Sequence, residues 1–104
     1  RTLMTDPSLI IMDEPCAGLD LYEREHLLED LNVFHERGIQ MIYVTHHIEE
    51  IVPVFTHVLL LREGEVVAKG EKESVLTSPF LKDAFGVDVH VDWEQGRPWI
   101  RVQG

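Results

Sequence analysis

Residues 9–15 have the sequence Leu-Ile-Ile-Met-Asp-Glu-Pro, an apolar run that stops at two adjacent carboxylates and a proline. A run that is apolar on both faces is typical of a strand buried on both sides, as in a parallel sheet covered by helices. The turn-forming residues Asp6-Pro7-Ser8 come directly before it. The stretch therefore predicts a buried strand over residues 9–12, with its acidic end at the edge of a sheet.

A helix and a second strand are predicted to follow. Asp20 is a candidate N-cap, and Glu23, three residues later, is placed to complete a capping box. Gly38 is placed to end the helix. Apolar residues recur at helical spacing over residues 21–37, namely Leu27, Leu28, Leu31 and Phe34. A second apolar strand is predicted over residues 40–45, and the short connections predict that the two strands are parallel.

The remaining segments predict short helices and antiparallel hairpins. Arg1–Met4 has the character of a helix tail and suggests that the chain is a piece of a longer one. A second hairpin is predicted between Val87 and Val102, with Trp93 and Trp99 packed across it. The other expected elements are short helices over residues 48–52, 72–76 and 79–85, and strands over 57–61 and 65–68 joined through Glu63-Gly64.

The amino-acid composition indicates a globular protein and argues against several other classes. The chain has 104 residues, of which 44% are hydrophobic and 27% charged, and this fits one globular domain. Nine basic and nineteen acidic residues give a formal charge of −10, which disfavours nucleic-acid binding and direct docking on an anionic membrane. The single cysteine, Cys16, excludes an intrachain disulfide and favours a reducing compartment. No apolar run is long enough to span a membrane, and residues 1–8 contain no signal-peptide core.

The strand ends carry a set of residues suited to phosphoryl transfer. Asp13 stands at the rim of the predicted sheet and can hold a hard cation, usually through water. Glu14 points elsewhere and can orient or deprotonate a water molecule. The second strand brings His46 to the same edge, because the carboxyl ends of parallel strands lie side by side. A metal carboxylate, a water-activating carboxylate and a histidine together indicate transfer of a phosphoryl group to water.

Three motifs in the same order and spacing resemble those of ATP-binding cassette (ABC) ATPases. Residues 9–15 resemble the Walker B strand with the catalytic glutamate that follows it. Ala17-Gly18-Leu19-Asp20 resembles the D-loop, and Thr45-His46 resembles the switch histidine. The resemblance extends from Arg1 to about Leu76, and Arg1–Met4 is similar to the end of the helix that follows the family's signature.

The rest of the family's phosphate-binding apparatus is absent from the sequence. No Gly-x-x-x-x-Gly-Lys-Ser/Thr loop and no Leu-Ser-Gly-Gly signature is present. The chain is therefore similar to the C-terminal half of an ABC transporter ATPase domain. The implied fold is α/β, a fragment of a P-loop NTPase with a parallel βαβ core followed by antiparallel hairpins. The implied division is residues 1–85 as part of the ATPase domain and 86–104 as a C-terminal β-hairpin extension.

The resemblance implies a role for each motif residue. Asp13 would help to hold Mg²⁺ near the β- and γ-phosphates of ATP, through water. Glu14 would be the general base or water-orienting residue, and His46 would contact the γ-phosphate. Asp20 would reach across a dimer of two ATPase domains. Cys16 stands where the family more often has Ser or Thr, which implies the loss of a small polar contact, and His47 replaces a common Asp and receives no role.

The resemblance also implies a function and partners. The expected function is part of the ATP-binding and hydrolysing subunit of an ABC transporter, which couples MgATP hydrolysis to transport across a membrane. The expected partners are a second ATPase domain and transmembrane permease subunits, at the cytoplasmic side of the cell membrane. Without the phosphate loop the chain alone is expected to be inactive. Its exposed apolar strand edges are expected to make it self-associate.

Other interpretations of the same residues stay open. The chain could come from a soluble ABC ATPase outside transport, or act as a non-catalytic interaction module through residues 85–104. Asp13-Glu14 could be an ordinary polar strand end, and Asp20 could serve only as an N-cap. The His46-His47 pair with nearby carboxylates could indicate a transition metal, although adjacent residues at a strand end point apart.

Overall fold

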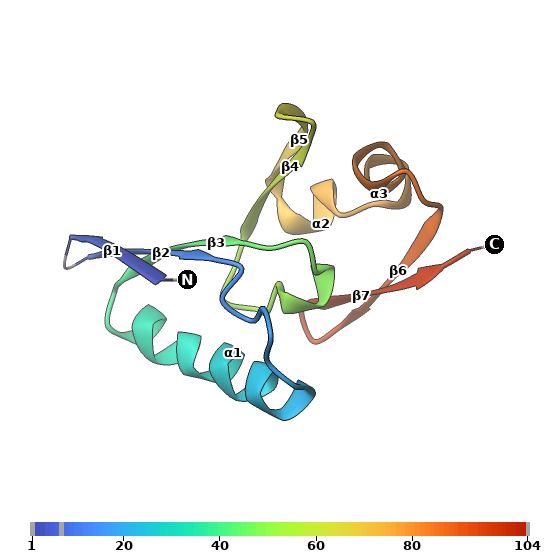
Figure 1. Ribbon diagram of the computed structural model, residues 1–104. Coiled ribbons are helices and arrows are strands. Elements are labelled where there is room, and N and C mark those ends of the chain that lie inside the picture. Colours follow the sequence, from blue (N-terminus) through green and yellow to red (C-terminus); the bar gives the residue numbers. More distant parts are fainter. Residues whose placement is uncertain (1, 7, 104) are drawn as a thin grey trace. The chain divides into compact units, whose positions relative to one another are not determined.

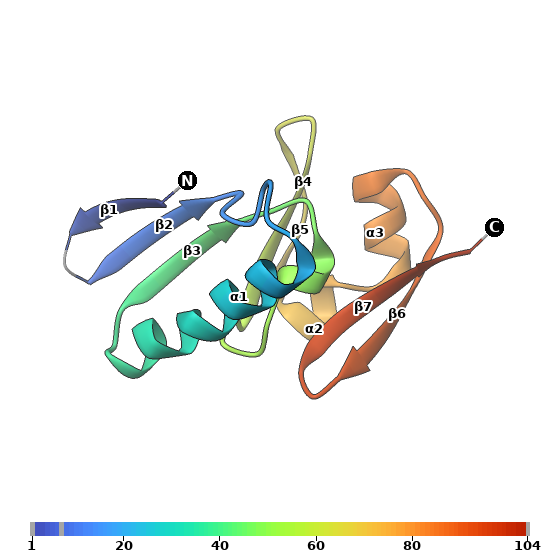
Figure 2. The same cartoon turned by 60° about the horizontal axis from the view of Figure 1, so that its bottom comes forward.

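The apolar run forms β2 (Leu9–Asp13), the middle strand of a three-stranded sheet in the order β1–β2–β3. β3 (Gln40–Val44) pairs with β2 in parallel register, so that Leu9 lies opposite Gln40 and Asp13 lies opposite Val44. The structure, a computed structural model, describes residues 2–6 and 8–103. Figure 2 shows the three strands side by side. The predicted parallel strand pair is confirmed.

Helix α1 (Leu21–Glu36) makes the crossover between β2 and β3, and both of its ends are capped as the sequence predicts. Asp20 Oδ1 accepts a hydrogen bond from Glu23 N at 2.8 Å, and Glu23 Oε1 accepts one from Asp20 N at 3.2 Å. At the other end Gly38 has φ +74°, a conformation that favours glycine. Gly38 N donates to His35 O, and Ile39 N donates to Phe34 O, both at 3.0 Å. These bonds form a Schellman motif, which ends the helix.

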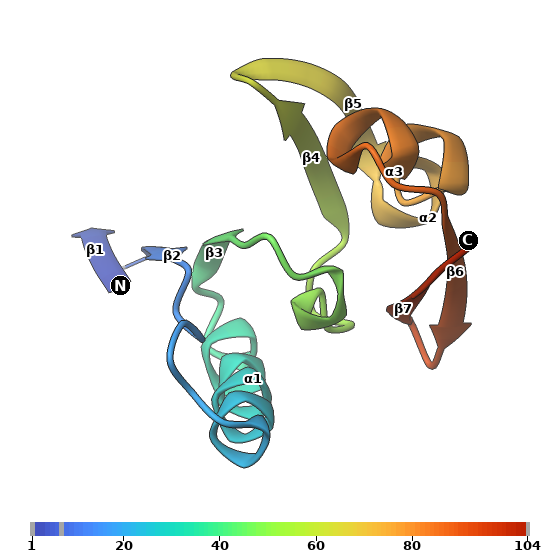
Figure 3. The same cartoon turned by 45° about the vertical axis from the view of Figure 1, so that its right-hand side comes forward.

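α1 lies on one face of the sheet (Figures 1 and 3), and the buried residues of β2 and α1 form the core on that face. Ile10 and Met12 are each 3% exposed, and Leu28 and Leu31 of α1 are 2% and 1% exposed. On the other face Leu9 and Ile11 of β2 are half-buried, and Ile42 of β3 is 49% exposed. The expectation that β2 is buried on both faces is therefore wrong, because no described helix of this unit covers its second face.

The expected helix tail at Arg1–Met4 is also wrong for the residues that the structure describes. Thr2–Asp6 forms strand β1, which pairs antiparallel with β2. The open edge of β2 offers backbone hydrogen-bond partners to this segment, whereas a helix of so few residues would be poorly nucleated. Arg1 and Pro7, the latter within the predicted Asp6-Pro7-Ser8 turn, lie outside the described residues.

By internal contacts the chain divides into two compact units, Arg1–Glu50 and Ile51–Gly104. The first contains the sheet, α1 and a short 3-10 helix, η1 (Ile48–Glu50), where a short helix over residues 48–52 is predicted. The boundary predicted between residues 85 and 86 stays a prediction. No described helix has both the length and the hydrophobicity needed to cross a membrane.

The second unit consists of two hairpins and two short helices. The predicted helices correspond to α2 (Lys72–Val75) and α3 (Ser78–Phe85). The strands are β4 (His57–Arg62), β5 (Glu65–Glu71), β6 (Val89–Glu94) and β7 (Arg97–Val102). Each hairpin turns through two residues with positive φ, Glu63-Gly64 and Gln95-Gly96, as the tightest hairpin turns require.

The core of this second unit joins both hairpins to the helices. Lys72 is 5% exposed, and its Nζ donates to Gly96 O in the second hairpin turn at 2.7 Å. Burial lowers the pKa of the Lys72 ammonium from its usual value. The most deeply buried apolar residues here are Leu60, Val75, Leu76, Leu81, Val89 and Pro98.

The two tryptophans do not pack across the terminal hairpin. Trp93 lies opposite Pro98, whereas Trp99 lies opposite Asp92. Because successive residues of a strand point to opposite faces, the two indole rings lie on opposite faces of the hairpin. The Arg97 guanidinium instead sits 4.5 Å from the centre of the Trp99 ring. The expected pairing is wrong because the Gln95-Gly96 turn sets a register that offsets them by one residue.

Replacing Leu31 by Ala should lower the free energy of unfolding by about 2–5 kcal/mol, because it leaves a cavity between α1 and the sheet. Val33→Ala is the matched control, since Val33 is on the same helix and 44% exposed. Its effect should stay below about 1 kcal/mol. Urea unfolding followed by circular dichroism measures both. Equal losses in the two variants would contradict the packing of α1 described above.

Candidate functional site

The parallel pairing of β2 and β3 brings Asp13, Glu14 and His46, which the sequence predicts to be functional residues, to one edge of the sheet. Glu14 N donates to Val44 O at 2.9 Å, which continues the pairing one residue beyond β2. His46 follows β3 by two residues, and its Nε2 lies 3.4 Å from Glu14 Oε1. The structure therefore joins the acidic end of one strand to the histidine after the next strand.

Glu14 is held in an unusual state. Its φ is +48°, in the left-handed region that residues with a Cβ adopt at a cost of about 1–3 kcal/mol. Its Oε1 is buried and has no hydrogen bond to any residue that the structure describes, and its side chain is 30% exposed overall. A buried carboxylate oxygen without a hydrogen bond is costly, so this atom has unused capacity to accept a proton or hold a water molecule. The imidazole of His46 is 84% exposed and open to a ligand on its solvent side.

Asp13 ends β2 and is exposed. Glu14, in contrast, follows the strand and has a left-handed backbone, so the two carboxylates are presented by different backbone conformations. No three His, Cys, Asp or Glu side chains are grouped to hold a metal within residues 2–6 and 8–103. Asp13 can thus offer one carboxylate to a cation. This fits Mg²⁺, which usually takes one or two protein carboxylates and completes its shell with water and substrate phosphates.

The structure places Asp20 at the N-terminus of α1, where it forms the capping box described above. Capping and contact with a second domain are compatible, because Asp20 is exposed. A role for Asp20 across a dimer stays a prediction.

Sequence reasoning missed a buried carboxylate next to this site. Glu50 is 2% exposed, and its Oε1 accepts hydrogen bonds from Tyr43 Oη at 2.6 Å and Thr45 Oγ1 at 2.9 Å. Tyr43 and Thr45 are two positions apart, so both hydroxyls point to one face of the chain. That spacing, with an acidic residue in the apolar stretch Ile48–Val52, is the signal that could have revealed it.

Cys16 joins the same network and keeps a polar contact. Its Sγ lies 3.2 Å from Tyr43 Oη. Burial raises the pKa of the Cys16 thiol. Burial, followed by the hydrogen bonds with Cys16 and Glu50, raises the pKa of Tyr43 far above its usual value. Both groups therefore stay protonated at neutral pH, and the loss at Cys16 of the contact that a Ser or Thr makes in the family stays a prediction.

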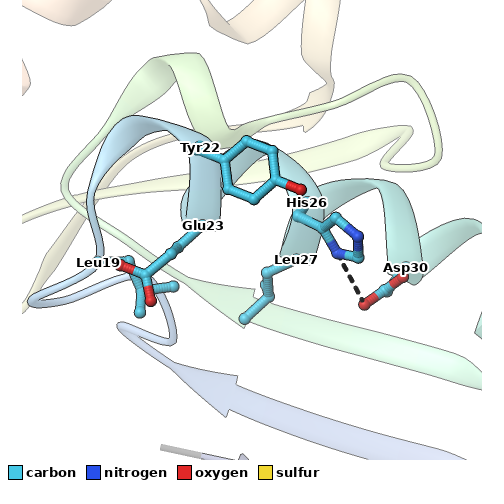
Figure 4. A pocket seen from close by; sticks show the side chains of 6 residues that line it. All are labelled: Leu19, Tyr22, Glu23, His26, Leu27 and Asp30. Carbon is cyan, nitrogen blue, oxygen red and sulfur yellow. Dashed lines mark ion pairs between the residues drawn. The ribbon is translucent and has the colours of Figure 1, made fainter.

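His47 and the surface around α1 add no chemistry to the strand edge. His47 is exposed, and it joins the network through its backbone, whose N–H donates to Thr45 Oγ1 at 2.9 Å. Figure 4 shows an open surface hollow along α1, in which the His26 ring faces Asp30 at 3.8 Å. Its lining residues are Leu19, Tyr22, Glu23, His26, Leu27 and Asp30. None of the four predicted site residues lines it.

Comparison with known proteins identifies relatives of the chain. The ABC transporter ATP-binding protein YlmA of Bacillus subtilis, itself uncharacterised, is 46% identical over 102 residues, which are 96% of this chain and 39% of that protein. A similar protein, YmeB of Lactococcus lactis, is 42% identical over 93 residues, 88% of this chain and 36% of that one. The molybdenum import ATP-binding protein ModC of Shewanella oneidensis is 35% identical over 104 residues, 99% of this chain and 25% of that one. No protein-family model matches the chain.

A solved structure shares the fold. It shows an inward-facing conformation of a metal-chelate type ABC transporter, matches with a TM-score of 0.75 at 23% identity, and covers 92% of this chain and 39% of its own. The chain spans no more than about two fifths of the length of these relatives. The comparisons confirm the resemblance to the C-terminal half of an ABC transporter ATPase domain and the P-loop NTPase fold class.

Asp20→Ala should cost about 1 kcal/mol of stability, because the capping box at the start of α1 is lost. Asp20→Asn should cost much less, since the amide oxygen still accepts from Glu23 N. Thermal unfolding of the two variants beside the parent chain distinguishes them. If Ala and Asn are equally destabilising, then the charge of Asp20 rather than its capping bond stabilises the helix.

Proposed function

We infer that this chain, a homologue of the ATP-binding proteins of ABC transporters, forms part of the subunit that binds and hydrolyses ATP and couples hydrolysis to transport across a membrane. The observation that carries this inference is the Glu14–His46 pair, 3.4 Å apart, at the shared end of two parallel strands. The names of the relatives favour transport over a soluble ABC ATPase of another kind.

Glu14 is the residue that we propose to activate water. Its buried Oε1 accepts no hydrogen bond from the described part of the chain and can therefore orient a water molecule and take its proton. The left-handed backbone at Glu14 turns the chain away from β2, and this places the carboxylate beside His46 and not along the strand.

His46 is proposed to stabilise the charge of the phosphate under attack. Its exposed imidazole can donate a hydrogen bond to the γ-phosphate while its Nε2 side stays near Glu14. Asp13, at the tip of β2, would hold Mg²⁺ through water. When bound with ATP, Mg²⁺ neutralises the charge on the β- and γ-phosphates. We propose Glu14 and His46 as catalytic residues, and Asp13 and Asp20 as nucleotide-site residues.

The remaining parts of the site are proposed to lie outside these 104 residues. The sequence contains no Gly-x-x-x-x-Gly-Lys-Ser/Thr loop to cradle phosphates. We propose that the chain works with that loop and with a second ATPase domain, which Asp20 would contact. It would act beside transmembrane permease subunits at the inner face of the cell membrane. Alone, it would bind ATP weakly and hydrolyse none.

A chimera tests this proposal, in which the chain replaces the matching 102-residue segment of YlmA from Bacillus subtilis. The chimera should hydrolyse MgATP, whereas Glu14→Gln should lower the rate by about 10²-fold or more. Glu29→Gln, an exposed carboxylate on α1, is the matched control and should leave the rate unchanged. The isolated chain should show no hydrolysis. Activity in the isolated chain that Glu14→Gln abolishes would refute the need for an external phosphate loop.

The isolated chain should also self-associate. Ile42 and Val44 are 49% and 47% exposed on the face of the sheet opposite α1. Among the described strands β3 is the last of this sheet, so its outer edge is open to pairing. Light scattering over a range of concentrations should show a rising mean mass, and Ile42→Lys should reduce it. Val66→Lys, 57% exposed in the other unit, is the control and should not. A constant monomer mass in the parent chain would contradict this prediction.

A further inference from the structure

We propose that Glu50 is a positioning residue, whose buried carboxylate holds the turn that presents His46 to Glu14. The proposal rests on the function proposed above, because it assigns a task to a residue next to that site. Glu50 belongs to none of the three motifs, and in η1 it is separated from His46 by three residues.

The hydrogen bonds that Glu50 accepts hold the end of β3 in place. Its Oε1 accepts from Tyr43 Oη at 2.6 Å and from Thr45 Oγ1 at 2.9 Å. Hydrogen bonds to an ionised acceptor are about twice as strong as those between neutral groups, and a carboxylate that is 2% exposed requires such donors. Thr45 is therefore held in one rotamer, with its proton directed toward Glu50.

This orientation of Thr45 closes the turn around His46. The Thr45 hydroxyl donates to Glu50, so its oxygen is free to accept, and it accepts from His47 N at 2.9 Å. His47 O in turn accepts from Glu50 N at 3.0 Å. His46 thus lies between two residues that are each tied to Glu50. Since the His46 side chain is 84% exposed, packing does little to fix it, and the backbone turn must set its position.

A second arm of the network reaches the loop that follows Glu14. Tyr43 Oη donates to Glu50, so it is available to accept from the Cys16 thiol, 3.2 Å away. Ala17 N donates to Glu14 O at 3.1 Å, which ties the same loop back to Glu14. Glu50 is thereby connected to both members of the pair, to His46 through Thr45 and to Glu14 through Tyr43 and Cys16. One carboxylate links the loops after β2 and β3.

The test uses the complete 104-residue chain without nucleotide and records the ¹⁵N and ¹H resonances of the His46 ring at one pH. Glu14→Gln gives the spectrum of a His46 ring whose carboxylate partner has been removed. Glu50→Leu and Thr45→Val should each shift the His46 resonances toward that spectrum. Glu50→Gln keeps the accepting oxygen and should restore most of the parent spectrum. Thr45→Val preserves the shape of the side chain and removes only its hydroxyl group. It therefore tests the same hydrogen bond if Glu50→Leu does not fold.

Leu31→Ala controls for a general loss of stability, because it empties part of the core without touching the network. It should leave the His46 resonances in place. The proposal is overturned if the His46 resonances of folded Thr45→Val are the same as those of the parent chain. It is also overturned if Leu31→Ala shifts them as far as Thr45→Val does. The measurement is independent of hydrolysis. If Glu14→Gln leaves the hydrolysis rate of the YlmA chimera unchanged, the proposed function is contradicted, whereas the proposal that Glu50 positions His46 is not.

Discussion

The parallel register of β2 against β3 is the constraint on which the site depends. Asp13 lies opposite Val44, and the bond from Glu14 N to Val44 O carries the pairing past the end of β2. A shift of one residue would send the Glu14 side chain to the other face and away from His46. The register is in turn set by α1, whose capped ends fix where the crossover leaves one strand and enters the next. The caps of α1 therefore help to determine the distance between Glu14 and His46.

The site carries local costs that the surrounding hydrogen bonds offset. Glu14 has a left-handed backbone and a buried oxygen without a hydrogen bond, and both features destabilise the ligand-free chain. Glu50, also buried, instead accepts hydrogen bonds from two hydroxyl donors at its Oε1. The two carboxylates thus have opposite roles in adjacent loops. The satisfied one makes the turn rigid, and the unsatisfied one remains available to bind water, because a group that already has its partners cannot also activate a reactant.

Features that depend on nearby residues could be predicted from the sequence. The capping box at Asp20, the end of α1 at Gly38 and the turn at Glu63-Gly64 each follow from local chemistry. Asp13, Glu14 and His46 could be placed at one edge because parallel strand ends must meet there. Features that depend on distant partners could not. Thr2–Met4 forms a strand because β2 offers it an edge, and the tryptophans separate because a turn sets the register. Glu50 could not be recognised from a sequence motif, because its hydrogen-bond partners Thr45 and Tyr43 lie five and seven residues earlier, outside η1.

These 104 residues contain the Glu14–His46 pair but not a phosphate-binding loop, and this separation has a physical consequence. The chain holds the groups that we propose to act on water, but its sequence contains no Gly-x-x-x-x-Gly-Lys-Ser/Thr loop to hold phosphate. A carboxylate and an imidazole accelerate phosphoryl transfer only when the phosphate is fixed beside them, since positioning supplies most of the catalysis. The Glu14–His46 pair must therefore stay ordered until a phosphate is brought to it. A network that links both loops through Glu50 meets this requirement, because it fixes the pair without using the ligand.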